Sequence, residues 1–139
     1  MSDGDELERL ADEAFAAVAA AGGDPRALDE PLRTVAIVYA AQAVLDDGGL
    51  AYFLANDWTG APSYEVFAEA FARIGAAGTA AVIRAAIERI GLPFPEVDRG
   101  LRQERLGALP EDELAALDAG LDDDGFERLA RWVADRDAD

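Results

Sequence analysis

The first stretch of the chain combines apolar and acidic positions at the spacing of an α-helix. Acidic side chains fall on one side of the helical wheel and apolar side chains on the other. The apolar side consists of Leu7, Leu10, Ala11, Ala14 and Val18. This pattern predicts an amphipathic helix over residues 4–21, inside an N-terminal segment 1–23 that Gly22 and Gly23 close.

A second helix is expected to begin near Asp29 or Glu30, with Pro31 in its first turn, and to end at about Asp46. Residues 35–41 are apolar almost all round, which indicates a central helix packed on several sides. The glycines at 48 and 49 then break the helix, because glycine permits backbone angles that other residues resist. We expect the short apolar segment that follows to form one turn of helix against the core.

Five further helices complete the predicted fold. The first of them follows Ser63 as its N-cap and carries core residues at helical spacing as far as Ile74. Thr79 is positioned to cap the next helix, which ends at Ile90. The last three helices are expected over residues 96–106, 110–119 and 125–136.

Length and composition agree with this helical pattern. Alanine dominates the hydrophobic content of 51%, and alanine-rich sequence favours helices. A chain of 139 residues is long enough for one sizeable core and too short for two. The sequence therefore predicts an all-α fold, a compact single-domain bundle of about six to eight helices over residues 1–139.

The chain is strongly acidic, with 29 acidic residues against 12 basic ones and a net charge of -17. Every basic residue is arginine. Residues 1–23 hold six acids and one arginine, residues 24–110 twelve and eight, and residues 111–139 eleven and three, which gives −5, −4 and −8. Such a surface repels nucleic acid and anionic membrane, so we expect a basic protein surface as the partner.

The residue types exclude the common catalytic arrangements. The chain contains no His, Cys or Lys, and its serines are Ser2 and Ser63, so no triad can be built. A pair of carboxylates could still act as in a glycosidase, but 29 acids make any pair chosen from sequence uninformative. We therefore expect a protein that is not an enzyme.

Two ligand motifs were tested against the sequence, and both fail. Aligning Gly125 with the invariant glycine of an EF-hand loop places Gly120 and Arg131 where carboxylate ligands belong. The acidic run before Gly125 is better explained as a solvated turn in which Asp124 caps the last helix, with Glu127 at capping-box spacing. The glycine pairs follow helices rather than strands, so they do not form phosphate loops. We expect no metal and no cofactor.

Aromatic residues cluster in the middle third of the chain. Most of them have helical spacing, which favours core packing over a ligand platform. They are Tyr52, Phe53, Trp58, Tyr64, Phe67 and Phe71. Trp58 lies in an expected loop and is the one candidate contact residue among them.

The chain also resembles a known family from residue 46 onward. Its segment Asp-Gly-Gly-Leu-Ala-Tyr-Phe-Leu-Ala-Asn at 47–56 is similar to the Asn-Gly-Gly-Phe, two-residue gap, Phe-Phe-Asn segment of the small acidic bacterial DNA-mimic proteins. Residues 69–76 are similar to the family's Ala-Leu-x-x-Ile-Gly-Ala, and the resemblance covers about residues 35–136. Asp47 replaces the family's Asn and Leu50 its Phe.

The family motif reads as mainly structural, with glycines for a bend and aromatic residues for the core. Its positions here are Asp47, Gly48, Gly49, Tyr52, Phe53, Asn56, Ile74 and Gly75. The resemblance implies a non-enzymatic protein that presents carboxylates in place of DNA phosphates and occupies the DNA-binding face of a transcriptional regulator. By analogy it also implies a homodimer.

Helix geometry is compatible with such mimicry. Carboxylates three or four residues apart on a helix lie about 5 to 6 Å apart, so a basic groove meets a potential similar to that of a DNA strand. The candidate phosphate-mimic positions, at both ends of the chain, are Asp5, Glu8, Asp12, Glu111, Glu113, Asp118, Asp122, Asp123 and Glu127.

An alternative explanation of the acidity stays open. Abundant Asp and Glu without Lys is also the composition of cytosolic proteins in a salt-adapted host, where the charge serves solubility. The protein would then be an interaction or immunity-type module that uses its aromatic middle third. In either case we expect a cytoplasmic protein, because the N-terminus is acidic where a secretory signal is basic. The apolar run 34–45 is also too short for a membrane span.

Overall fold

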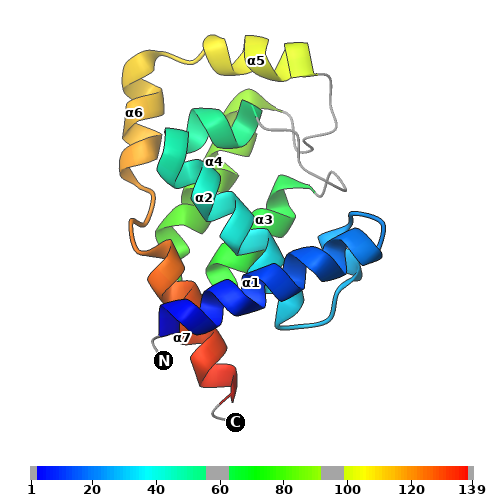
Figure 1. Cartoon of the computed structure of the whole chain (residues 1–139). Coiled ribbons are helices and arrows are strands. Elements are labelled where there is room, and N and C mark those ends of the chain that lie inside the picture. Colours follow the sequence, from blue (N-terminus) through cyan, green and yellow to red (C-terminus); the bar gives the residue numbers. More distant parts are fainter. Residues whose placement is uncertain (1–2, 56–62, 92–98, 138–139) are drawn as a thin grey trace.

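The computed structural model describes residues 3–55, 63–91 and 99–137, and this part of the chain is helical without any strand. Figure 1 shows the arrangement of the helices. Their bounds are α1 Asp3–Ala20, the 3-10 helix η1 Pro25–Ala27, α2 Leu32–Ala55, α3 Tyr64–Arg73, α4 Ala77–Ile90, α5 Arg99–Gly107, α6 Glu111–Ala119 and α7 Gly125–Asp137. The predicted all-α fold is confirmed.

Helix α2 is the centre of the bundle, as its apolar sequence predicts. The side chains of Val35, Ile37 and Val38 are all buried, although they point in different directions around the helix. Helices α1, α3, α5, α6 and α7 each pack against α2. A helix that is apolar on every side must be covered on every side, and this requirement organises the other helices.

The outer helices contribute amphipathic stripes to one continuous core. The predicted stripe of α1 is confirmed, because Leu7, Ala11 and Ala14 are buried. Helices α3 and α4 form a tight pair whose apolar faces, including Phe67 and Ile83, turn inward. Helix α7 packs on both α1 and α2, so the two terminal helices meet at one end of the molecule, and α5 lies at the other end (Figure 1).

The glycine pair breaks the helix as predicted, although slightly later than expected. We expected the first helical segment to end at about Asp46, but it continues to Gly48, and the chain kinks at Gly49, which has φ 69° and ψ −161°. These angles belong to a region that is essentially restricted to glycine. After the kink, residues 50–55 continue as a second helical segment with Leu50 and Phe53 in the core.

Two helix starts differ from the prediction. Helix α2 starts at Leu32, and the Glu30 carboxylate accepts the Thr34 N–H at 2.8 Å. Helix α4 starts at Ala77 rather than at Thr79, and the Thr79 side chain is buried in its first turn. The described part of α5 begins at Arg99, and the expected start at 96 lies outside the described residues.

Ser63 does precede α3 as predicted, but its side chain makes no capping hydrogen bond there.

Among the described helices, none combines the length and the apolarity that crossing a bilayer requires.

The Gly49 backbone yields a stability prediction. Gly49→Ala places a Cβ on a backbone conformation that costs of order 1–3 kcal/mol for any L-residue, and we expect the free energy of unfolding to fall by about that amount. Gly107→Ala is the matched control, because a Cβ there meets nothing within 4 Å. Urea unfolding of both variants measures the difference; equal stabilities for the two would contradict the assignment.

Candidate acidic interaction surface

The predicted acids of α1 project to solvent. Asp5, Glu8 and Asp12 are all exposed, and they lie on the side of the helix opposite to its buried stripe. Their spacing of three and four residues places successive carboxylates on one side of the helix. Because α1 packs on both α2 and α7, its buried face is fixed and its acidic face has a fixed direction.

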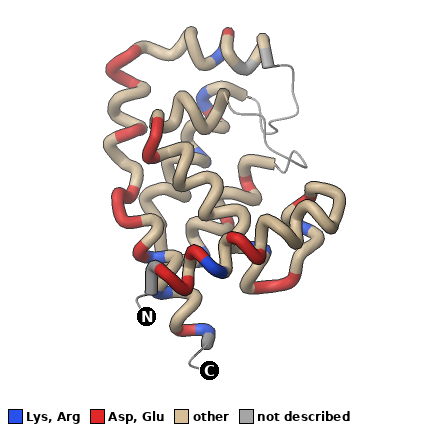
Figure 2. Tube along the Cα trace, in the orientation of Figure 1, with Lys and Arg blue, Asp and Glu red and all other residues tan. Residues whose placement is uncertain are grey.

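A second set of acids lies on α6 and at the start of α7. Glu111, Asp123 and Glu127 are exposed. Glu111 and its neighbours in the first turn of α6 also interact favourably with the positive end of the helix dipole. Figure 2 shows acidic positions running down the edge formed by α6 and the α6–α7 connection, toward the end where α1 and α7 meet. Of the candidates, these three and the three on α1 form what we call the acidic surface.

The three other predicted positions are half-buried and hold parts of the fold together. The Asp118 carboxylate accepts the Leu50 N–H at 2.8 Å, immediately after the kink at Gly49. The Asp122 carboxylate accepts the Thr79 N–H at 3.1 Å, and the Thr79 hydroxyl accepts the Asp122 N–H at 2.9 Å. Glu113 forms an ion pair with Arg89 of α4. These acids anchor the α6 region to α2 and α4.

Ion pairs occupy many of the arginines. In the described part of the chain, carboxylates pair with Arg9, Arg26, Arg73, Arg84, Arg89 and Arg128. The Arg84–Glu65 pair has two short contacts, of 2.8 and 3.0 Å, and its hydrogen bond raises the pKa of Arg84. Pairing within the fold leaves fewer cations to neutralise the acidic surface.

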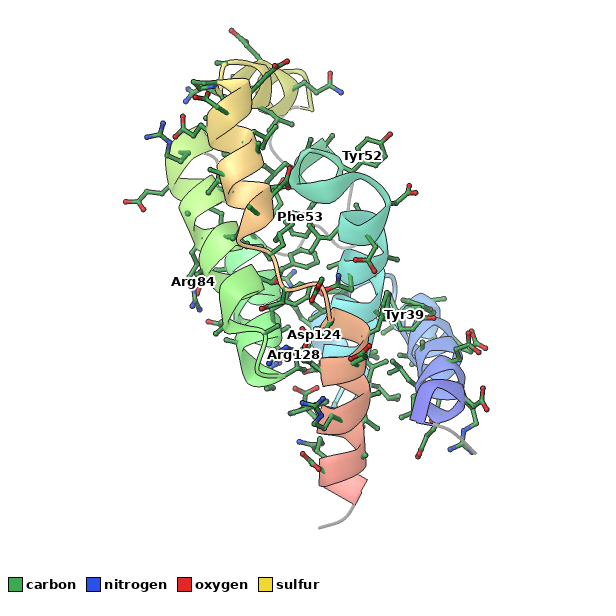
Figure 3. The ribbon with its side chains drawn as sticks, turned by 90° about the vertical axis from the view of Figure 1, so that its left-hand side faces the viewer. Tyr39, Tyr52, Phe53, Arg84, Asp124 and Arg128 are labelled. Carbon is green, nitrogen blue, oxygen red and sulfur yellow. The ribbon has the colours of Figure 1, made fainter. Side chains whose placement is uncertain are left out.

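Asp124 and Arg128 form the best-defined charged contact near the acidic surface. The Arg128 Nε donates to Asp124 at 2.7 Å, and its Nη1 donates to the carbonyl of Gly75 at 2.7 Å, so the side chain ties α7 to the end of α3. The hydrogen bond from Arg128 lowers the pKa of Asp124. Asp124 directly precedes α7, where we expected a cap, and its carboxylate pairs with the guanidinium of the first turn. Figure 3 labels both residues.

The family motif is structural in most of its described positions. Gly49 forms the kink, Phe53 and Ile74 are buried, and Gly75 ends α3 with φ 86°. In this αL-type ending the Ala76 N–H donates to the carbonyl of Phe71 at 2.9 Å. The other motif positions are Asp47, which is exposed, Gly48, which is half-buried, and Asn56, which lies outside the described residues.

Tyr52 corrects the expectation that both aromatic residues of the motif pack in the core. Its side chain is 57% exposed, whereas the adjacent Phe53 is fully buried. The Tyr52 ring lies over Gly48, one turn earlier, where a Cβ would collide with it. The remaining aromatic residues Tyr64, Phe67 and Phe71 are buried, which confirms their core role. Trp58 lies outside the described residues.

Some surface residues of α1 and α2 were not among the predicted site residues. Asp46 is exposed on the same face of α2 as Tyr39, seven residues earlier. Phe15 of α1 is 40% exposed and contacts Tyr39. The sequence could have indicated Phe15, because a large apolar residue next to the acidic face of an amphipathic helix is unusual. Within the described residues, no group of three or more acidic side chains is arranged to hold a metal ion.

The fold and surface define an all-α protein with an acidic face. The chain belongs to the DMP19-like protein family, whose model matches residues 26–136. That range includes helices α2 to α6 and α7 as far as Arg136, and it begins earlier than the resemblance deduced from the motif. Neither a curated protein nor a solved structure matched the chain.

Removing the Asp118 carboxylate tests its structural role. Asp118→Ala leaves the Leu50 N–H without its acceptor at the start of a helical segment, and loss of such a cap costs about 1 kcal/mol. Asp123→Ala removes an exposed acid of the same region and should have little effect. Chemical denaturation compares them; a smaller loss for Asp118→Ala than for Asp123→Ala would refute the role.

The Asp124–Arg128 pair predicts a pH dependence. Because the folded-state pKa of Asp124 is lowered, its charged form stabilises the fold above the ordinary carboxyl pKa of about 4, and this contribution is lost as the pH falls through the lower folded value. Asp124→Asn should therefore be less stable than wild type at pH 7, with the difference disappearing once the pH falls below the folded-state pKa of Asp124. Glu127→Gln, which removes an exposed charge from the same helix, controls for general charge repulsion.

Unfolding free energies measured across this pH range check the prediction. A deficit of Asp124→Asn relative to Glu127→Gln that stays constant with pH would contradict it.

Proposed function

We propose that this protein is a non-enzymatic acidic binding protein that occupies the basic DNA-binding face of a transcriptional regulator, or of another cationic protein, in place of DNA. The observation that carries the proposal is the acidic surface itself. Six predicted acids are exposed, five of them on α1, α6 and α7 and one, Asp123, in the connection between α6 and α7, and these helices are fixed by packing on the core. Membership of the DMP19-like family, together with the resemblance to DNA-mimic proteins, supports the same function.

Rigid presentation is what distinguishes such a surface from an acidic tail. A basic groove gains from an array of carboxylates only if the array does not have to be ordered on binding, because each side chain that becomes immobilised costs free energy. The backbone of α1 is held by Leu7, Ala11 and Ala14, and the α6–α7 connection is held by Asp118 and Asp122. These anchors support a pre-organised array.

The sequence supports a binding role more than a catalytic one. General bases and nucleophiles of the usual kinds are missing from the composition, since the chain has no His, Cys or Lys. Coulombic attraction to a cationic partner raises the association rate and declines with ionic strength. We therefore expect binding that weakens steeply as salt is added.

Affinity capture followed by DNA competition tests the proposal. The tagged protein is incubated with cytosolic extract at low salt, captured partners are identified by mass spectrometry, and duplex DNA is then added to the purified complex. We expect the DNA to displace the protein, because both occupy the same basic face. A partner that binds this protein and DNA simultaneously would exclude mimicry.

A charge-matched pair of variants then assigns the surface. The test variant neutralises four acids of the acidic surface by Glu8→Gln, Asp12→Asn, Glu111→Gln and Glu127→Gln. The control neutralises four exposed acids on other elements by Asp29→Asn, Glu69→Gln, Glu88→Gln and Glu104→Gln. The net charge changes equally, so only position differs.

The test variant should lose roughly tenfold or more in affinity and part of the salt dependence, and the control variant much less. Equal losses would show that the total charge matters and the array does not. If Tyr52→Ala weakens the complex more than the test variant does, the alternative of an interaction module that uses its aromatic middle third is favoured instead.

A further inference from the structure

Three aromatic rings from different helices form a row beside the acidic surface. Phe15 of α1 meets Tyr39 of α2 edge to face, with ring centroids 5.9 Å apart, and Tyr39 meets Phe126 of α7 at 5.0 Å. We call Phe15, Tyr39 and Phe126 the aromatic row. Figure 3 shows Tyr39 where α1 and α2 meet, beside the start of α7.

The outer end of the aromatic row is open to solvent. Phe15 is 40% exposed, and it is one of two large hydrophobic side chains exposed in the described part of the chain. Tyr39 and Phe126 are half-buried. The core-facing stripe of α1 is complete without Phe15, because Leu7, Ala11 and Ala14 already fill it. The packing of α1 on the core therefore does not explain why a large aromatic residue stands at position 15.

Exposed acids accompany each ring of the aromatic row along the chain. On α1, Glu8 and Asp12 lie seven and three residues before Phe15, which places them on the same flank of the helix. On α2, Asp46 lies seven residues after Tyr39, and both side chains reach the surface. At the start of α7, Phe126 is preceded by Asp123 and followed by Glu127, which are both exposed.

Aromatic faces surrounded by carboxylates suit an arginine side chain best. A guanidinium stacks on an aromatic ring and pairs with a carboxylate at the same time, and it loses less hydration than a lysine ammonium does. The chain itself makes a cation–π contact on α7, where the Arg136 guanidinium lies 5.0 Å from the centre of the Trp132 ring. The negative charge around the row excludes an anionic partner.

From these observations we propose that the aromatic row and its bordering acids receive an arginine side chain from the cationic partner. This inference rests on the proposed function and specifies its chemistry. The acids supply long-range attraction that any cation feels, whereas the aromatic row supplies a short-range preference for arginine over lysine. The two contributions have different salt dependences, because stacking is screened much less than attraction between exposed charges.

Two peptides of equal charge test the proposal, octa-arginine and octa-lysine, each titrated into the protein at several salt concentrations. We expect wild type to bind octa-arginine roughly two- to fivefold more tightly than octa-lysine, as one cation–π contact provides. Phe15→Ala should remove this preference. The double variant Glu8→Gln, Asp12→Asn should weaken both peptides alike and reduce the salt dependence while keeping the preference.

Two control variants keep the result interpretable. Phe15→Leu keeps an apolar side chain and removes only the ring, so it should lose the arginine preference with the fold intact. Tyr52→Ala removes the other exposed aromatic residue, outside the aromatic row, and should keep the preference.

Equal affinity of wild type for the two peptides, or a preference that survives in both Phe15 variants, would overturn the inference while leaving the proposed function standing. Failure of both peptides to bind at low salt would count against the proposed function as well.

Discussion

The constraint on which the structure depends is that α2 is apolar almost all round over residues 35–41. Such a helix is stable in water only when other elements cover it all round, and α1, α3, α5, α6 and α7 each cover part of it. The amphipathic helices bury their apolar faces on α2 and must then turn their charged faces outward. The exposure of Glu8 and Asp12 is thus a consequence of the burial of Leu7, Ala11 and Ala14.

The kink at Gly49 gives one of the acidic residues a structural role, while other acidic residues stay at the surface. A kink inside a helix leaves a backbone N–H without its helical acceptor, and at Leu50 the Asp118 carboxylate takes that place. Asp122 serves the first turn of α4 in the same way. The protein therefore uses some carboxylates to hold the α6 region in position, and that region carries others, such as Glu111 and Asp123, at the surface. The hydrogen bond between Asp118 and Leu50 thus connects the family's glycine motif to the helix that carries part of the acidic surface.

The packing of α1 and α7 on α2 brings together the two kinds of recognition that we propose, attraction by carboxylates and contact with the aromatic row. Carboxylates on fixed helices attract a cationic protein from a distance, and the attraction is insensitive to the identity of the cation. Phe15, Tyr39 and Phe126 come from three helices, so their row exists only where α1 and α7 both pack on α2. Acidity can also follow from salt adaptation, but an exposed ring such as Phe15 does not add to solubility.

The sequence by itself determined the fold class, the helices and the central place of α2, because these depend on periodicity and on apolar content that are local properties of the chain. It also determined that α1 has an acidic face. Only the tertiary structure decided which acids are structural. Asp118 and Asp123 look alike in sequence, but one accepts a hydrogen bond from a residue 68 positions away, and the other lies at the surface. The aromatic row and the exposure of Tyr52 were undetermined for the same physical reason: burial and long-range hydrogen bonds depend on which helices meet, and no local pattern records that.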